Sequence, residues 1–162
     1  MRLALSRKSH IYALLISALV LADMASKEWA LNVLKSEPFG YMPALKGVFS
    51  FSFMWNEGAA FSLFRDHPLI VTIVSAVILF LVCLAIFCTR LMTPRVRVAA
   101  CLIFAGGLGN LIDRFRFSAV VDFIQFDFIS FPVFNFADIC VTGGAILYVA
   151  ALFFPRPKAS AK

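Results

Sequence analysis

Four stretches of this sequence are apolar and long enough, or nearly long enough, to cross a lipid bilayer as helices, and they limit the fold more than any other feature. A bilayer core requires about 20 mostly apolar residues in a helix. The predicted spans cover about residues 11–34, 68–88, 96–112 and 138–154, and flanking residues must complete the last two. Because 62% of the 162 residues are hydrophobic, a compact soluble fold could not bury them. We predict an all-α membrane protein with four transmembrane helices in a single domain over residues 1–162.

Lysine and arginine are concentrated in three short segments that contain no acid, whereas all nine acids lie between Asp23 and Asp138. The positive-inside rule produces this distribution, so the net charge of +6 indicates orientation in a membrane and not nucleic-acid binding. Both termini are predicted to face the cytoplasm, and residues 35–67 and 113–137 to face outward. The segments hold nine of the fifteen basic residues: Arg2, Arg7 and Lys8; Arg90, Arg95 and Arg97; Arg156, Lys158 and Lys162. A cleaved signal peptide at the start is less consistent with the sequence, since no small-x-small site follows Ala22.

The outward segments are rich in phenylalanine, because thirteen of the nineteen phenylalanines lie within residues 49–64 and 115–136. From Val48 to Trp55 aromatic residues alternate with serine or methionine, which is the period of a β-strand. We therefore predict a small, β-like, Phe-rich cap on the extracytoplasmic side. Two interpretations remain open: a sheet that rests on the lipid interface, or a folded cap with its own core.

Charged residues at membrane depth are costly, so each requires a partner or a function. Asp23 and Lys27 are four residues apart on the first predicted helix, in the order that favours an ion pair. This pair either braces neighbouring helices or takes part in a site directly. We favour the brace.

The third span ends in the sequence GGLGNLIDR, residues 106–114. Three glycines within four helical positions cost roughly 1 kcal/mol each, and close approach of another helix would explain Gly106 and its neighbours. Asn110 and Arg114 are one turn apart and point the same way. Asp113 is predicted to be a structural acid neutralised by Arg114 and Arg116.

Two acids have no cation nearby in sequence and belong to the outer side. Asp122 lies among apolar residues, and Asp138 begins the fourth span, where it could simply be a helix N-cap. Two carboxylates in a weakly solvated pocket would share one proton, and such a dyad can activate water against a peptide carbonyl. The four cysteines lie in apolar runs and lack metal-ligand spacing, so no metal or other cofactor is expected. An aspartyl dyad is our preferred enzymatic interpretation.

Five short motifs, which cover nearly the whole chain, occur in order: Asp23-Met24-Ala25-Ser26-Lys27, Asn56-Glu57-Gly58-Ala59-Ala60-Phe61, Gly106 to Arg114, Val121-Asp122-Phe123 and Phe134-Asn135-Phe136-Ala137-Asp138. Together they resemble the motifs of the bacterial lipoprotein signal peptidases (signal peptidase II), aspartyl proteases of the inner membrane. Two slight departures are Met24, at a position often held by glutamine, and the acidic Glu57 at a variable position.

The resemblance implies that Asp122 and Asp138 are catalytic and that the substrate is a prolipoprotein carrying diacylglycerol on a cysteine, cut just before that cysteine. It also implies a multi-pass protein of the bacterial inner membrane, in contact with lipid and expected to be a monomer, with its active site toward the outer face. The implied substrate-binding residues are Asn56, Gly58, Asn110, Arg114 and Asn135, and the implied supporting residues are Asp23, Lys27, Gly106, Asp113 and Ala137. The alternatives are a small ion-coupled transporter, whose charges should spread across the midplane of several spans, and a structural membrane protein.

Overall fold

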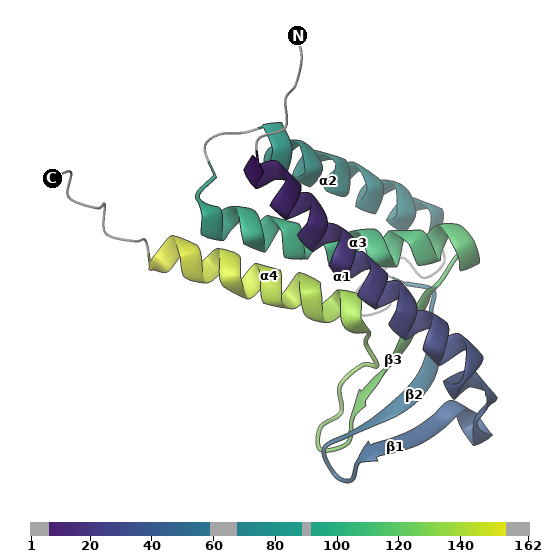
Figure 1. Ribbon diagram of the computed structural model, residues 1–162. Coiled ribbons are helices and arrows are strands. Elements are labelled where there is room, and N and C mark those ends of the chain that lie inside the picture. The colour runs from purple at the N-terminus through teal and green to yellow at the C-terminus, as the bar shows by residue number, and fades with distance from the viewer. Residues whose placement is uncertain (1–6, 59–67, 89–91, 155–162) are drawn as a thin grey trace, which may run out of the picture.

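The computed structural model describes residues 7–58, 68–88 and 92–154, and it contains four long helices (Figure 1). All four are long and apolar enough to cross a membrane, which confirms the predicted fold class. The second span is as predicted, whereas the third and fourth helices begin two residues earlier, and the third continues five residues beyond Ile112. The helices are α1 (Arg7–Asn32), α2 (Pro68–Cys88), α3 (Pro94–Phe117) and α4 (Phe136–Phe153).

Local sequence signals explain where α3 and α4 begin and end. The Thr93 hydroxyl accepts a bond from the Val96 amide at 3.4 Å, Pro94 occupies the first turn of α3, and Ser118 closes the helix in the left-handed conformation. The N-cap of α4 is Asn135, not Asp138 as the capping alternative required. Asp138 is the third helical residue, and its carboxylate completes a capping box with Asn135.

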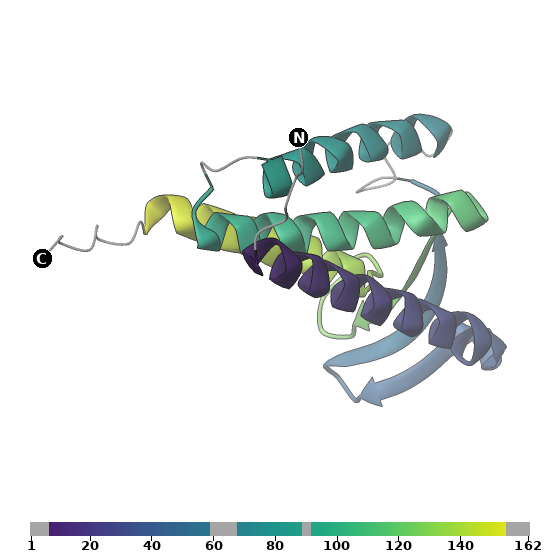
Figure 2. The same ribbon diagram turned by 45° about the horizontal axis from the view of Figure 1, so that its top comes forward.

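Helix α3 is the centre of the bundle and packs against the other three helices. In Figures 1 and 2 the start of α1 and the end of α4 lie at the end of the bundle far from the sheet. Close approach between α3 and α4 requires glycine, because a Cβ on Gly106 would overlap the Ala137 carbonyl oxygen and one on Gly144 would lie 2.8 Å from the Ala99 oxygen. The predicted tight packing at Gly106 is therefore confirmed.

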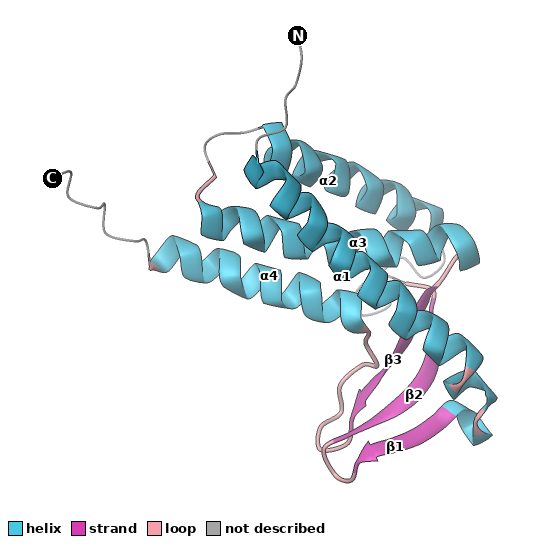
Figure 3. Ribbon diagram, in the orientation of Figure 1, coloured by secondary structure: helices cyan, strands magenta, loops and turns pink. Residues whose placement is uncertain are grey.

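A three-stranded antiparallel sheet projects from one end of the helices (Figure 3). Two short 3₁₀ turns, Leu34–Ser36 and Pro38–Gly40, lead from α1 into β1 (Tyr41–Leu45). The strand order is β1-β2-β3, with β2 (Phe49–Asn56) in the middle and β3 (Val120–Phe126) beside it. A register shift between Phe51 and Met54 places Met54 opposite Asp122.

The sheet has a hydrophobic core against the end of α1. Ala30 and Leu34 are buried with Val121 and Phe123, and the ring centroids of Trp29 and Phe51 are 5.0 Å apart. The sheet therefore has a hydrophobic core, as the folded-cap interpretation predicts, but it shares this core with the end of α1. Its extracytoplasmic position and its contact with lipid stay predictions. The outward segment predicted over 113–137 is shorter, since its first five residues belong to α3 and its last two to α4.

Candidate active site

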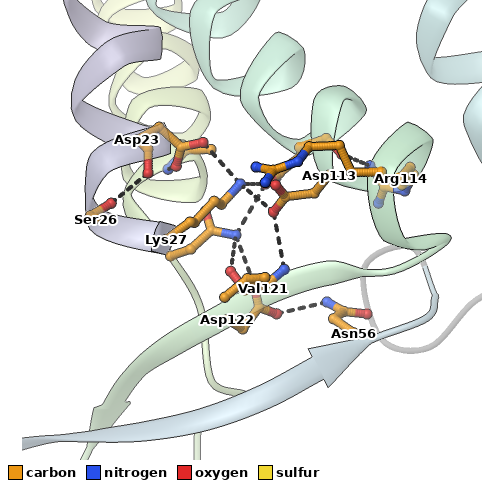
Figure 4. Close-up of polar contacts among 12 residues, drawn as sticks. Asp23, Ser26, Lys27, Asn56, Asp113, Arg114, Val121 and Asp122 are labelled. Carbon is orange, nitrogen blue, oxygen red and sulfur yellow. Dashed lines mark hydrogen bonds and ion pairs between the residues drawn. The ribbon is translucent and has the colours of Figure 1, made fainter. Parts of the chain in front are cut away.

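A buried cluster of one cation and two carboxylates joins α1 to α3 (Figure 4). Lys27 Nζ lies 2.9 Å from Asp23 Oδ2 and 3.0 Å from Asp113 Oδ2, and the lysine is only 2% exposed. The predicted Asp23–Lys27 pair is confirmed. The predicted partners of Asp113 are wrong, because Lys27 neutralises it while Arg116 pairs with Glu28 at 2.6 Å.

Asp23 and Asp113 also accept hydrogen bonds from the backbone amides of two neighbouring elements. Asp23 Oδ1 accepts a hydrogen bond of 2.9 Å from the Ala137 amide at the start of α4. Asp113 Oδ2 accepts one of 3.1 Å from the Val121 amide of β3. A Cβ on Gly109 would overlap the Asp23 carboxylate, so this glycine makes room for the cluster. The cluster thus fixes the elements that carry Asp122 and Asp138, which supports the interpretation of Asp23 as a brace.

Two asparagine side chains connect Lys27 to the two remaining aspartates. Lys27 Nζ donates to Asn110 Oδ1 at 2.9 Å, and Asn110 Nδ2 donates to Asp138 Oδ1 at 2.9 Å. Asn135, which is fully buried, donates from Nδ2 to Asn110 Oδ1 at 3.0 Å and to Asp122 Oδ1 at 2.7 Å. The ion cluster and the aspartates therefore form one continuous polar network.

All four carboxylate oxygens of Asp122 and Asp138 accept hydrogen bonds from nitrogen donors. Asn56 Nδ2 donates to Asp122 Oδ2 at 2.9 Å, and the Asn135 amide donates to Asp138 Oδ2 at 3.1 Å. Asn135 therefore holds one aspartate by its side chain and the other by its backbone. This arrangement fixes both carboxylates at the junction of β3 and α4.

Asp122 lies in an environment that disfavours its charge. Its side chain is buried within the apolar β3, with 1% of the residue exposed. Burial first, and the neighbouring Asp138 carboxylate second, raise the pKa of Asp122 to about 7, although hydrogen bonds from Asn56 and Asn135 act in the opposite direction. A carboxyl group with this pKa can hold or release a proton near neutral pH.

Both aspartates open onto one cavity of about 510 Å³. Asn56 stands beside them at its polar end, and apolar side chains line most of the rest. The lining residues are Asn56, Asp122, Phe126, Phe131, Pro132, Val133, Phe134, Asp138, Ile139, Thr142, Gly143 and Ile146. The predicted dyad therefore meets at a space that can hold a ligand.

Only one of the five residues expected to bind substrate lines this cavity. Asn56 does so, whereas Asn110 and Asn135 contact the aspartates without lining it. Gly58 donates its amide to Asn56 Oδ1 at 3.1 Å, and Arg114 donates to the Gly58 carbonyl at 3.4 Å. These contacts fix Asn56 in turn.

Several residues of the predicted motifs and basic segments lie outside the described ranges. They are Ala59, Ala60 and Phe61 of the motif that begins at Asn56, and Arg2, Arg90, Arg156, Lys158 and Lys162 of the basic segments.

Sequence reasoning missed the part of the cavity that α4 forms. Thr142 and Gly143 line it one turn beyond Asp138. Two consecutive glycines inside an apolar span, Gly143 and Gly144, were the available signal.

The sequence of residues 15–154 matches the family described as Signal peptidase (SPase) II. The chain belongs to the signal peptidase II family. The chain is 35% identical over 133 residues to a lipoprotein signal peptidase of Clostridium tetani, with 80% of this chain and 84% of that protein covered. A Streptococcus pyogenes lipoprotein signal peptidase is 31% identical over 146 residues, covering 90% of this chain and 95% of that one.

The fold is also that of a solved bacterial membrane enzyme, determined by the in meso method at 2.3 Å resolution. The TM-score is 0.83 at 26% identity, and 94% of this chain and 95% of that chain are covered. This signal peptidase II is therefore an aspartic peptidase of a bacterial membrane, with four candidate spans. Family membership decides against the small ion-coupled transporter.

Proposed function

We propose that this signal peptidase II cleaves prolipoproteins just before a cysteine that carries diacylglycerol, and that Asp122 and Asp138 activate the attacking water. The observation that best supports the proposal is that the carboxylates of Asp122 and Asp138 lie at the same site. Both carboxylates open onto one cavity, both are held by Asn135, and the raised pKa of Asp122 allows one of them to keep a proton near neutral pH.

In the proposed reaction the two aspartates act in opposite protonation states. Asp138, in the first turn of α4, takes a proton from water, and the water oxygen attacks the carbonyl carbon of the scissile bond. Protonated Asp122 donates a hydrogen bond to the carbonyl oxygen as negative charge develops there. The tetrahedral intermediate collapses when the C–N bond breaks and the leaving nitrogen takes up the proton held by Asp138. The products are a signal peptide with a free carboxyl group and a lipid-modified cysteine with a free amine.

The remaining residues fall into two proposed roles. Asn56 offers its amide to the peptide at the cavity wall, because it is the one predicted binding residue that lines the space. Asn110, Arg114, Asn135 and Gly58 act as positioning residues, since their contacts fix Asn56 or the aspartates. The supporting set Asp23, Lys27, Gly106, Asp113 and Ala137 fixes α1, α3, α4 and β3 relative to one another.

We propose that the sheet and the aspartates lie at the outer face of the bacterial inner membrane, and that both termini lie in the cytoplasm. The helices support this orientation, because the start of α1 and the end of α4 lie together at the end opposite the sheet (Figures 1 and 2). Basic residues are concentrated near that end in the sequence. The site is formed by residues of one chain, so a monomer suffices for activity.

The proposal is tested with purified Asp122→Asn and Asp138→Asn variants and a diacylglyceryl-modified prolipoprotein. Each variant should lose cleavage, because neither amide can exchange a proton as a carboxyl group does. Asp127→Asn is the matched control, since Asp127 is an exposed acid directly after β3 whose contact is to Ser50 at 2.8 Å. Near-normal turnover in either dyad variant would refute the mechanism, and failure of the unmodified enzyme to release the signal peptide would refute the substrate.

A further inference from the structure

The cavity continues beyond the aspartates along one face of α4. Ile139, Thr142, Gly143 and Ile146 line it at the spacing i, i+3, i+4 and i+7, which is a single helical stripe. From Asp138 to Ile146 the stripe runs about 12 Å at 1.5 Å per residue. The opposite face of α4 packs on α3 through residues such as Gly144. The stripe therefore lies on the side of α4 that points away from the other helices, and α4 is a candidate membrane span.

The cavity has one polar end and one apolar end. Among the described lining residues, the side chains other than Asp122, Asp138 and Asn56 carry no charge or amide, and Thr142 adds one hydroxyl. The wall opposite α4 is the segment Phe131–Phe134 with Phe126 of β3. A matching ligand carries its polar group at the aspartates and an apolar part that runs along α4.

Gly143 is not explained by the packing of the helices. Among the described residues, no heavy atom outside the neighbouring part of α4 lies within 4 Å of the position that its Cβ would occupy, whereas a Cβ on Gly106 or Gly144 would clash with backbone oxygens. Glycine inside a helix costs about 1 kcal/mol relative to alanine. Because Gly143 lines the cavity, its missing side chain leaves this space open for a ligand.

We infer that this stripe binds an acyl chain of the diacylglyceryl group and that Gly143 sets the length of chain that fits. The inference rests on the proposed function. The glycerol is attached to the cysteine directly after the scissile bond, so its acyl chains must start close to the aspartates. The cavity of about 510 Å³ can hold such a chain. A signal-peptide helix at the same place would respond to the peptide and not to the length of the acyl chain.

The experiment compares two synthetic lipopeptides that differ only in their acyl chains, dipalmitoyl and dibutanoyl. Gly143→Leu should raise KM for the dipalmitoyl peptide about tenfold or more, which corresponds to the lost burial of roughly two methylene groups. It should leave kcat/KM for the dibutanoyl peptide within about twofold, since a short chain ends before this position. Ala145→Leu is the matched control, because Ala145 is an exposed residue of α4 outside the cavity lining and should change neither value.

Equal losses with both lipopeptides would overturn the inference, since the position would then act on the peptide or on the fold. Unchanged values for both would also overturn it. A second measurement does not depend on turnover: a photoreactive palmitoyl chain should label residues 139–146 of α4 in the Asp138→Asn enzyme, and Gly143→Leu should remove that label. If the unmodified enzyme cleaves neither lipopeptide, the proposed function fails, while labelling at α4 still decides whether the acyl chain lies in the cavity.

Discussion

Replacing Asp122 with asparagine should change how the stability of the enzyme depends on pH. The folded protein holds the pKa of Asp122 near 7, against an ordinary value of 3.8, mainly because the carboxyl group is buried. Between these two values the folded state keeps the proton and the unfolded state has lost it. Stability from this group is therefore greatest at low pH and is lost as the pH rises toward 7.

The size of the effect follows from the width of that window. From pH 5 to pH 7 the wild-type protein should lose roughly 2 kcal/mol of unfolding free energy through this one group, and less than about 1 kcal/mol more above pH 7. Asparagine has no such dependence. It should instead carry a constant penalty of about 1–3 kcal/mol, because its amide nitrogen cannot accept the bond that Asn56 or Asn135 now donates.

The measurement is unfolding in detergent micelles at pH 5 and pH 8, for the wild type, Asp122→Asn and Asp127→Asn. The Asp122 variant should be the less stable protein at pH 5, and by pH 8 the difference should shrink or reverse by about 3 kcal/mol. Asp127→Asn controls for the loss of one formal charge. A stability difference that is the same at both pH values would refute the assignment of the raised pKa to Asp122.

Four further predictions follow from the same contacts. Cleavage by the wild type should fall as the pH rises through about 7, because Asp122 then loses the proton it donates to the carbonyl oxygen; a pH–rate profile that stays flat to pH 9 would contradict this. Asn135→Ala should lower kcat by about 100-fold and the stability by about 1–2 kcal/mol, as measured by kinetics and thermal unfolding, since Asp122 loses a side-chain donor and the cap of α4 loses the acceptor of the Asp138 amide. Gly109→Ala should lower the melting temperature, because the added Cβ overlaps a buried carboxylate. Lys27→Met should cost about 3–5 kcal/mol by leaving two carboxylates without a cation, whereas Glu28→Ala, which breaks a half-exposed pair, should cost less than about 1 kcal/mol in the same unfolding assay.

Several features were predictable because they depend on residues close together in sequence. The spans follow from runs of apolar residues, and α2 occupies the predicted range. The Asp23–Lys27 pair follows from a spacing of four on a helix, and β2 follows from the alternation after Val48. Gly106 and its neighbours indicated close packing because a glycine-rich helix segment is otherwise unfavourable.

Other features could not be read from local spacing. Asp113 was predicted to be neutralised by Arg114 and Arg116. A helix directs the adjacent Arg114 to a different face, Arg116 pairs with Glu28, and Lys27 of α1 reaches Asp113 instead. Asn135 was expected to bind substrate, and its contacts with both aspartates arise only where α4 meets β3. The cavity along Gly143 likewise exists only between α4 and a loop that folds back beside it.

The sequence by itself determined the four helices, the strand after residue 48 and the residues able to take part in catalysis or binding. Periodicity and the cost of burying charge act on each segment separately. The tertiary structure decided which cation neutralises which acid, how deeply Asp122 is buried and what shape of ligand fits beside Asp138. These properties depend on distances between segments that are far apart in the chain, and such distances are set by the packing of the whole bundle.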